Sequence, residues 1–190
     1  VRNQLVEVSP YIGNLRSLKE LFIGANPFES LPREIGALSA LENADISYSQ
    51  LTGLPKEIGK LVNLRTLYLN QNKIKTLPDE IGNLTSLREL SLYHNRLSEL
   101  PPGFSGLRNL RMLDIRSNAF RLFPPPVADL SYLEILNLGN DSIYGSNQMD
   151  SLPPGIGNLA NLRMLYLEYN NLKYIPKEFG KLIMLEKLNL

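Results

Sequence analysis

The sequence predicts an α/β solenoid: a right-handed arc with a parallel β-sheet on its concave face and extended or 3-10 segments on its convex face. Three observations predict it. A leucine returns at a fixed interval, apolar and polar residues alternate just after it, and a proline follows later in the same unit. A fixed period of 20 to 30 residues is typical of arrays in which each unit packs only on its neighbours.

The repeat length is set by the first leucine of each unit. These leucines follow one another at intervals of 23 residues, except for one interval of 29, and they are Leu18, Leu41, Leu64, Leu87, Leu110, Leu133, Leu162 and Leu185. We therefore expect a single domain over residues 1–190, with a partial repeat over 1–17, repeats starting at 18, 41, 64, 87, 110, 133 and 162, and a partial repeat over 185–190. Neither end supplies the polar cap that terminal repeats normally carry, which predicts that the chain is part of a longer one.

Each unit is expected to contain one short strand. In the unit that begins at Leu64, Leu67 and Leu69 alternate with polar residues, which is the period of a strand with one buried face. Thr66, Tyr68 and Asn70 should then point outwards. Stacked strands lie about 4.8 Å apart, so outward positions should align from one repeat to the next.

An amide recurs eight positions after the first leucine of most units. A buried amide must have its donors and acceptors satisfied, so we predict a ladder of hydrogen bonds to the backbone of adjacent coils. The ladder residues are Asn26, Asn72, Asn95, Asn118 and Asn170. By the same count, Ser49 replaces the asparagine in the second repeat and Asp141 replaces it in the sixth.

The second half of each unit should return along the convex side. A proline follows an apolar residue in nearly every unit, as at Leu54-Pro55, and this excludes a continuous helix. A glycine follows a branched or aromatic residue, as at Ile58-Gly59 and Phe179-Gly180, where we expect a tight bend towards the next strand.

Two repeats depart from the pattern. Ala44 stands where the other units have leucine, and since a Leu-to-Ala gap in a core costs about 2 to 5 kcal/mol, we expect neighbouring side chains to fill it. The sixth repeat has six extra residues, which we place near Tyr144–Asp150. Insertions in solenoids form loops on one face and often take part in binding, and a neutral bulge is the alternative.

Composition argues against several function classes. The net charge is +1, which does not favour a nucleic-acid partner or an anionic membrane, and the absence of cysteine excludes disulfides and cysteine-ligated zinc. No apolar run is long enough to span a bilayer, so no transmembrane segment is expected. His94 is the only histidine, and a flat sheet lacks an oxyanion hole, so we expect no enzyme, no catalytic residue, no metal and no cofactor.

The outward strand positions predict two patches. The tyrosine patch comprises Tyr48, Tyr68, Tyr93, His94 and Arg116, and the methionine patch comprises Met112, Ile135, Met164, Tyr166 and Tyr169. Tyr and Arg are enriched at interface hot spots, and contiguous exposed apolar surface usually marks an interaction site. The predicted partner-binding residues are these ten together with Asn70, Asp114, Asn137 and Glu168. The alternative is that these side chains only cover the sheet.

Three arginines occupy one edge of consecutive strands: Arg65, Arg88 and Arg111. Like charges on adjacent strands repel each other, so an acidic partner would relieve them.

The segments Leu51-Thr-Gly-Leu-Pro-Lys-Glu-Ile-Gly-Lys-Leu61 and Ile74-Lys-Thr-Leu-Pro-Asp-Glu-Ile-Gly-Asn-Leu84 resemble the intracellular Ras-group leucine-rich repeat family, and similar repeats occur in proteins of Leptospira. The resemblance covers nearly the whole chain, but it rests on residues that build the coil. It implies a cytoplasmic protein-protein interaction scaffold in signalling, associated with a membrane at most through a partner. A secreted or surface recognition module is the first alternative. A structural spacer, or a unit that self-associates through its uncapped ends, is the second.

Overall fold

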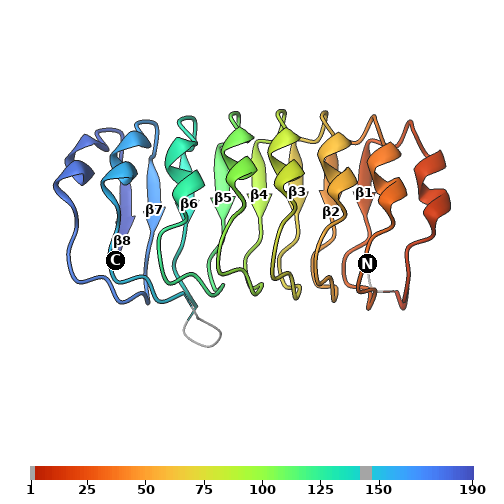
Figure 1. The fold of residues 1–190 in the computed structure, drawn as a ribbon, viewed down its shortest axis with the longest axis horizontal. Coiled ribbons are helices and arrows are strands. Elements are labelled where there is room, and N and C mark those ends of the chain that lie inside the picture. Colours follow the sequence, from red (N-terminus) through yellow and green to blue (C-terminus); the bar gives the residue numbers. More distant parts are fainter. Residues whose placement is uncertain (1–2, 142–146) are drawn as a thin grey trace.

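One parallel sheet runs the length of the molecule in the computed structural model, which describes residues 3–141 and 147–190 (Figure 1). Each strand pairs with the next in sequence, one repeat further on, as Leu67 does with Leu90. The strands are β1 (Glu20–Phe22), β2 (Asn43–Asp45), β3 (Thr66–Tyr68), β4 (Glu89–Ser91), β5 (Met112–Asp114), β6 (Ile135–Asn137), β7 (Met164–Tyr166) and β8 (Lys187–Asn189). These positions confirm the strands expected from the apolar alternation.

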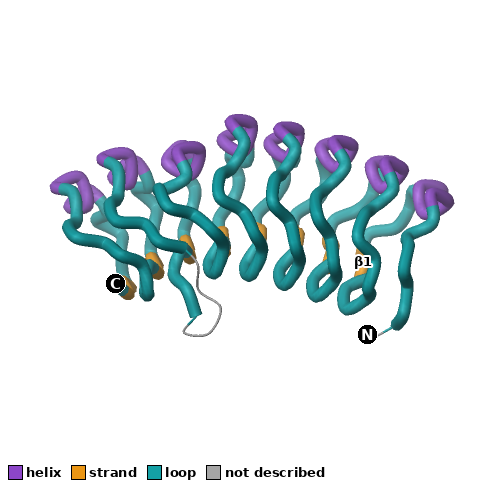
Figure 2. The backbone as a smooth tube through the Cα atoms, turned by 60° about the horizontal axis from the view of Figure 1, so that its bottom comes forward, coloured by secondary structure: helices purple, strands orange, loops and turns teal. Residues whose placement is uncertain are grey.

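A five-residue 3-10 helix forms the opposite side of each coil. The helices are η1 (Pro10–Asn14), η2 (Arg33–Ala37), η3 (Lys56–Lys60), η4 (Asp79–Asn83), η5 (Pro102–Gly106), η6 (Pro125–Asp129), η7 (Pro154–Asn158) and η8 (Lys177–Lys181). Figure 2 shows them along the outer curve of an arc, with the strands on the inner side. The predicted solenoid is therefore confirmed, with the sheet on the concave face.

The prolines determine where these helices begin. Pro55 lies directly before η3 in an extended conformation, with φ −68° and ψ 146°, and the other repeats place a proline in the same way. Ser9 takes this place before η1, where its hydroxyl accepts a hydrogen bond from the Tyr11 N–H. From η2 to η8, each helix then ends at a leucine that is buried in the core, whereas Leu15 after η1 is exposed.

A single core of stacked leucines fills the space between the two faces. Phe28, Phe104 and Phe120 add fully buried aromatic rings to it. Ala44 is buried as well and stays in register between Leu21 and Leu67, so the smaller side chain does not interrupt the sheet.

The asparagine ladder is confirmed. The Asn72 amide donates to the carbonyl oxygens of Ile46 (2.9 Å) and Leu69 (3.0 Å), and its oxygen accepts from the Leu51 N–H (3.0 Å). Asn95, Asn118 and Asn170 repeat this arrangement. Each asparagine thus joins its own coil to the preceding one.

The prediction that Asp141 holds the ladder position of the sixth repeat is wrong. Asn147 holds it: its oxygen accepts from the Phe120 N–H (3.0 Å) and its amide donates to the Leu138 carbonyl (3.1 Å). A carboxylate has no N–H to donate to a carbonyl, so the asparagine occupies this place. The six extra residues therefore precede Asn147.

The insertion therefore ends before Asn147, and the prediction that it extends to Asp150 is wrong. Residues 147–150 belong to the regular coil, and Met149 is fully buried in the core. Asn140 closes the base of the insertion, because its amide donates to the Asn147 carbonyl (2.9 Å) and its oxygen accepts from the Asn147 N–H (3.0 Å). Tyr144 and its neighbours at 142–146 lie outside the described residues, so their binding role stays a prediction.

The expected tight bend does not explain the glycines of the convex side. No glycine among the described residues has a positive φ. They allow close stacking instead, since a Cβ on Gly59 would lie 2.4 Å from the Glu80 carbonyl oxygen in the next helix. The left-handed backbone occurs elsewhere, directly before the ladder position, at Ala25, Tyr48, Gln71, His94, Ser117 and Tyr169.

Ser49 interrupts the ladder, and restoring it should stabilise the fold. The Ser49 hydroxyl is buried and has no hydrogen-bond partner among the described residues. We expect Ser49→Asn to raise the free energy of unfolding by about 1 kcal/mol. The new amide would reach backbone groups equivalent to those that Asn72 bonds, one coil earlier. Urea unfolding of Ser49→Asn and of the reverse change, Asn72→Ser, measures both effects. A gain in Ser49→Asn of less than the error, together with no loss in Asn72→Ser, would contradict a stabilising ladder.

Helix stacking predicts that the same substitution lowers stability at one glycine and has little effect at an equivalent one. Gly59→Ala should lower the free energy of unfolding by about 1 to 3 kcal/mol, because the added methyl group meets backbone that cannot move away easily. Gly180→Ala is the matched control, since no described atom lies within 4 Å of the added Cβ. Thermal unfolding of both variants tests the idea, which fails if the two lose equal stability.

Candidate binding surface

The concave face carries every residue that the sequence predicted for partner binding. Strand register aligns these residues in rows at the second and fourth positions after the first leucine of each unit, and backbone hydrogen bonds between coils continue the alignment to the sixth and seventh positions. All fourteen are at least partly exposed. Tyr48 and Tyr169 are the most accessible of them, at 59% and 67%. The structure thus brings the predicted residues together, while their role in binding stays a prediction.

The tyrosine patch is held together by direct contacts. The Tyr68 hydroxyl donates to a Glu89 carboxylate oxygen at 2.8 Å, and the Gln71 amide donates to the Tyr93 hydroxyl. The Arg116 guanidinium lies over the Tyr93 ring, 4.6 Å from its centroid. These contacts hold Tyr68, Tyr93 and Arg116 in place before any partner arrives.

Burial and the adjacent Glu89 carboxylate raise the pKa of Tyr68 to about 12. The phenol is therefore neutral at physiological pH and keeps its hydrogen bond to Glu89. Neither Glu89 nor Gln71 is among the residues predicted from the sequence, although each lies one repeat away from its tyrosine partner. Cross-strand register was the signal that could have identified them.

A charged cluster lies beside this patch. Arg116 forms an ion pair with Asp114 at 3.1 Å, and Asp114 also accepts a hydrogen bond from the Arg116 N–H at 3.2 Å. Burial raises the pKa of Asp114, and the Arg116 guanidinium acts against that rise. Glu168 adds a second acidic group nearby, and its charge also raises the pKa of Asp114.

Gly139 makes room for Glu168 on the sheet. A Cβ on this glycine would lie 2.7 Å from the Glu168 carboxyl carbon, so any other residue would displace the carboxylate. Arg116 Nε and Glu168 Oε2 are both buried and have no hydrogen-bond partner among the described residues. An unsatisfied buried polar atom costs stability. The cluster therefore carries one unsatisfied donor and one unsatisfied acceptor just below the concave surface.

The methionine patch forms a continuous apolar row. Met112, Ile135 and Met164 are paired in register on β5, β6 and β7, and each is half-buried on the outward face of the sheet. Lys187 follows in this row, with its ammonium group 5.0 Å from the centroid of the Tyr166 ring. The predicted outward orientation of these side chains is confirmed.

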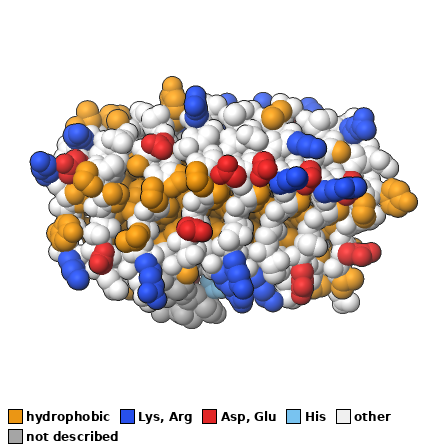
Figure 3. All heavy atoms as spheres, viewed as in Figure 1, with side chains coloured by type: hydrophobic (Ala, Val, Ile, Leu, Met, Phe, Trp, Pro, Cys, Tyr) orange, Lys and Arg blue, Asp and Glu red, His pale blue; other side chains and the backbone are white. Residues whose placement is uncertain are grey.

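The rest of the described surface offers little for chemistry. Within residues 3–141 and 147–190, no group of three His, Cys, Asp or Glu side chains is placed to hold a metal ion. In that same part of the chain, no helix is both long and apolar enough to cross a bilayer. In the view of Figure 3, hydrophobic side chains form a band along the coils, with charged side chains on both sides of it.

Comparison with protein-family models identifies the repeats. A model described as a leucine-rich repeat region matches residues 7–96 and 56–147, and a second, described as a leucine rich repeat, matches residues 161–182. No curated protein sequence matches the chain.

Several solved structures are similar. A Leptospira interrogans LRR protein has a TM-score of 0.85 and 35% identity, over 98% of this chain and 52% of that one. A TDR receptor has a TM-score of 0.81 and 30% identity, over 97% of this chain and 32% of that one. TLR13 in its complex with ssRNA13 has a TM-score of 0.82 and 27% identity, over 95% of this chain and 26% of that one. The chain thus spans about half the length of the first and less of the other two.

These comparisons agree with the geometry. The fold is one that generally serves as a non-enzymatic protein-interaction module, and the concave face of this chain is built of aligned side chains rather than around an enclosed pocket. The finer placement in the Ras group stays a prediction. The 23-residue period, the asparagine ladder and the matching family models show that the chain belongs to the leucine-rich repeat proteins.

Proposed function

We propose that this chain is a non-catalytic scaffold that binds a protein partner on its concave sheet and acts in signalling. One observation carries the proposal: the concave face holds Tyr and Arg side chains fixed by contacts between coils, beside a half-buried row of Met and Ile side chains. The general use of the fold in protein interaction supports it.

The size of this face suits a folded protein. Eight strands about 4.8 Å apart give a sheet of roughly 35 Å, which is long enough for an interface of standard size. The exposed Tyr48 and Tyr169 stand towards opposite ends of the candidate surface, and the Arg116 cluster lies between them. Hot-spot residue types thus surround a polar centre.

Order in the free protein favours affinity. Tyr68 and Tyr93 each have a hydrogen-bond partner on another coil, and Arg116 is held by both Asp114 and Tyr93. Side chains that are already fixed lose less conformational entropy on binding.

We place this function in the cytoplasm, with membrane contact only through a partner, because the repeats resemble the Ras group. The similar structures favour a second candidate, a secreted or surface recognition module, since one of them is named a receptor and another belongs to Leptospira. TLR13 is in a complex with ssRNA13, but the net charge of +1 on this chain does not favour a nucleic-acid ligand.

Two tyrosines test the concave surface without disturbing the fold. Tyr48→Ala and Tyr169→Ala remove exposed rings, and loss of a hot-spot side chain costs about 2 kcal/mol, or roughly a 30-fold weaker affinity. Tyr174→Ala is the matched control, because Tyr174 is 63% exposed and lies in the segment that leads into η8, outside the fourteen predicted binding residues. Partners captured from the lysate and the medium of the source cell would be identified and their affinities for each variant measured.

The outcomes separate the alternatives. A partner from the lysate that loses affinity only for the concave variants supports the scaffold, and one from the medium supports the recognition module. Unchanged binding by both concave variants, or an equal loss of affinity with Tyr174→Ala, would contradict the concave-face proposal and favour a spacer. A single-stranded RNA added as a competitor should leave protein binding unchanged.

A further inference from the structure

We propose that Arg65, Arg88 and Arg111 form a binding site for a doubly charged oxyanion of the phosphate or sulfate type. These residues, with Ser86, Asn109 and Tyr132, line a cavity of about 360 Å³, which we call the arginine pocket. The proposal goes beyond the concave-face function. The pocket lies at the amino-terminal ends of β3, β4 and β5, and it shares no residue with the fourteen described above.

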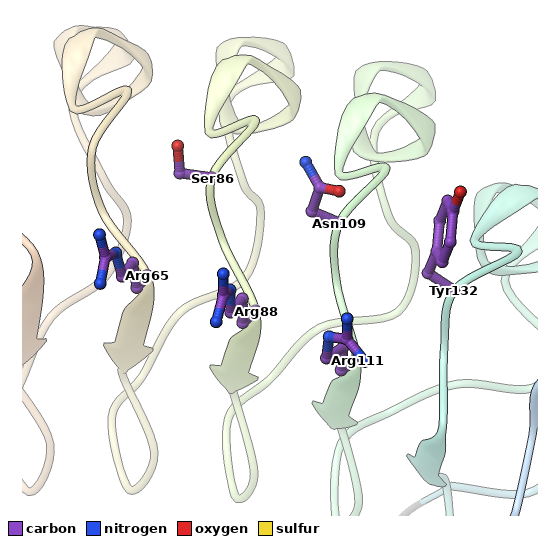
Figure 4. Close-up of a pocket in the computed structure, with 6 residues that line it drawn as sticks. All are labelled: Arg65, Ser86, Arg88, Asn109, Arg111 and Tyr132. Atoms are coloured by element: carbon purple, nitrogen blue, oxygen red, sulfur yellow. The ribbon is translucent and has the colours of Figure 1, made fainter.

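The backbone places the three arginines in a line. The Arg88 N–H donates to the Arg65 carbonyl and the Arg111 N–H donates to the Arg88 carbonyl, both at 2.8 Å. Residues bonded in this way keep the spacing of the neighbouring strands that follow them, about 4.8 Å. Figure 4 shows the three side chains just before β3, β4 and β5, with Ser86, Asn109 and Tyr132 in a second line nearer the 3-10 helices. Three guanidinium groups therefore border one open cavity.

No ion pair in the described part of the chain neutralises the positive charge at the centre of this line. Arg65 pairs with Glu42 at 3.5 Å and Arg111 pairs with Glu134, and both glutamates belong to the flanking coils. Arg88 has no ion pair among the described residues, and no acidic residue lines the cavity. Glu89, the residue next to Arg88 in sequence, accepts a hydrogen bond from the Tyr68 hydroxyl on the concave face.

The donor set fits an oxyanion with several oxygens. A guanidinium binds phosphate through two parallel N–H groups, and its planar fork makes arginine the preferred residue for such recognition. The Ser86 and Tyr132 hydroxyls also border the cavity, and neither has a hydrogen-bond partner within the described part of the chain. A single carboxylate accepts fewer hydrogen bonds than these groups donate, whereas a tetrahedral dianion can accept from several of them.

Titration of the full chain with inorganic phosphate tests the site. The experiment is run at about pH 8, where phosphate carries close to two charges, at constant ionic strength in chloride, and is followed by NMR of the arginine Nε–H groups. We expect saturable shifts at Arg65, Arg88 and Arg111, and an affinity at least tenfold weaker in Arg88→Gln. This variant loses no ion pair, so its fold should be unaffected.

Control variants separate this proposal from the concave-face function. Arg96→Gln removes an exposed arginine that does not line the pocket, and Tyr48→Ala changes only the concave surface, so both should bind phosphate as the parent does. Absence of saturable binding by the parent, or equal affinity in Arg88→Gln, would overturn the proposal.

Two further ligands identify the source of the anion. A phosphoserine peptide that binds more tightly than inorganic phosphate, and only when phosphorylated, would identify a phosphoprotein. Equal affinity for the peptide and for inorganic phosphate would identify the free ion. In both cases binding should weaken in Arg88→Gln.

Discussion

The hydrogen bonds of the buried asparagines are the constraint on which the rest of this structure depends. Each strand has only three residues, so the chain leaves the sheet almost at once and brings carbonyl groups into a core of leucines. Those carbonyls need donors that the short sheet does not provide. One asparagine amide supplies them to two successive coils, as Asn72 does for Ile46 and Leu69. Coil geometry and coil spacing are therefore determined by the same side chain.

This constraint also produces the candidate binding surface. Because each coil is joined to the preceding one in the same way, every outward position continues as a row along the sheet. The residue directly before the ladder position adopts a left-handed backbone, which costs about 1 to 2 kcal/mol outside glycine. Tyr48, His94 and Tyr169 stand at this position. The turn that completes the ladder thus presents large side chains at the border of the concave face.

Polar groups are treated differently on the two sides of the sheet. Towards the core, the ladder asparagines are hydrogen-bonded, and the Ser49 hydroxyl at the equivalent place in the second repeat has no partner among the described residues. On the concave face, Arg116 and Glu168 retain unsatisfied atoms, and Arg88 at the sheet edge has no ion pair among the described residues. Departures from complete hydrogen bonding that cluster on an exposed face favour a role in binding over one in stability.

The sequence by itself determined the solenoid, the strand positions, the outward rows and the five ladder asparagines, because all of these follow from a period that repeats. Only the tertiary structure decided the features that depend on contacts between coils. It placed Asn147 rather than Asp141 in the ladder, because hydrogen bonding and not sequence count determines where an insertion begins. It showed that Gly59 is required by the approach of the next helix rather than by a bend, since a single repeat contains no information about its neighbour's distance. It also joined Tyr68 to Glu89 and left Arg88 without an ion pair among the residues described, because side-chain pairing depends on which residues the stack brings together.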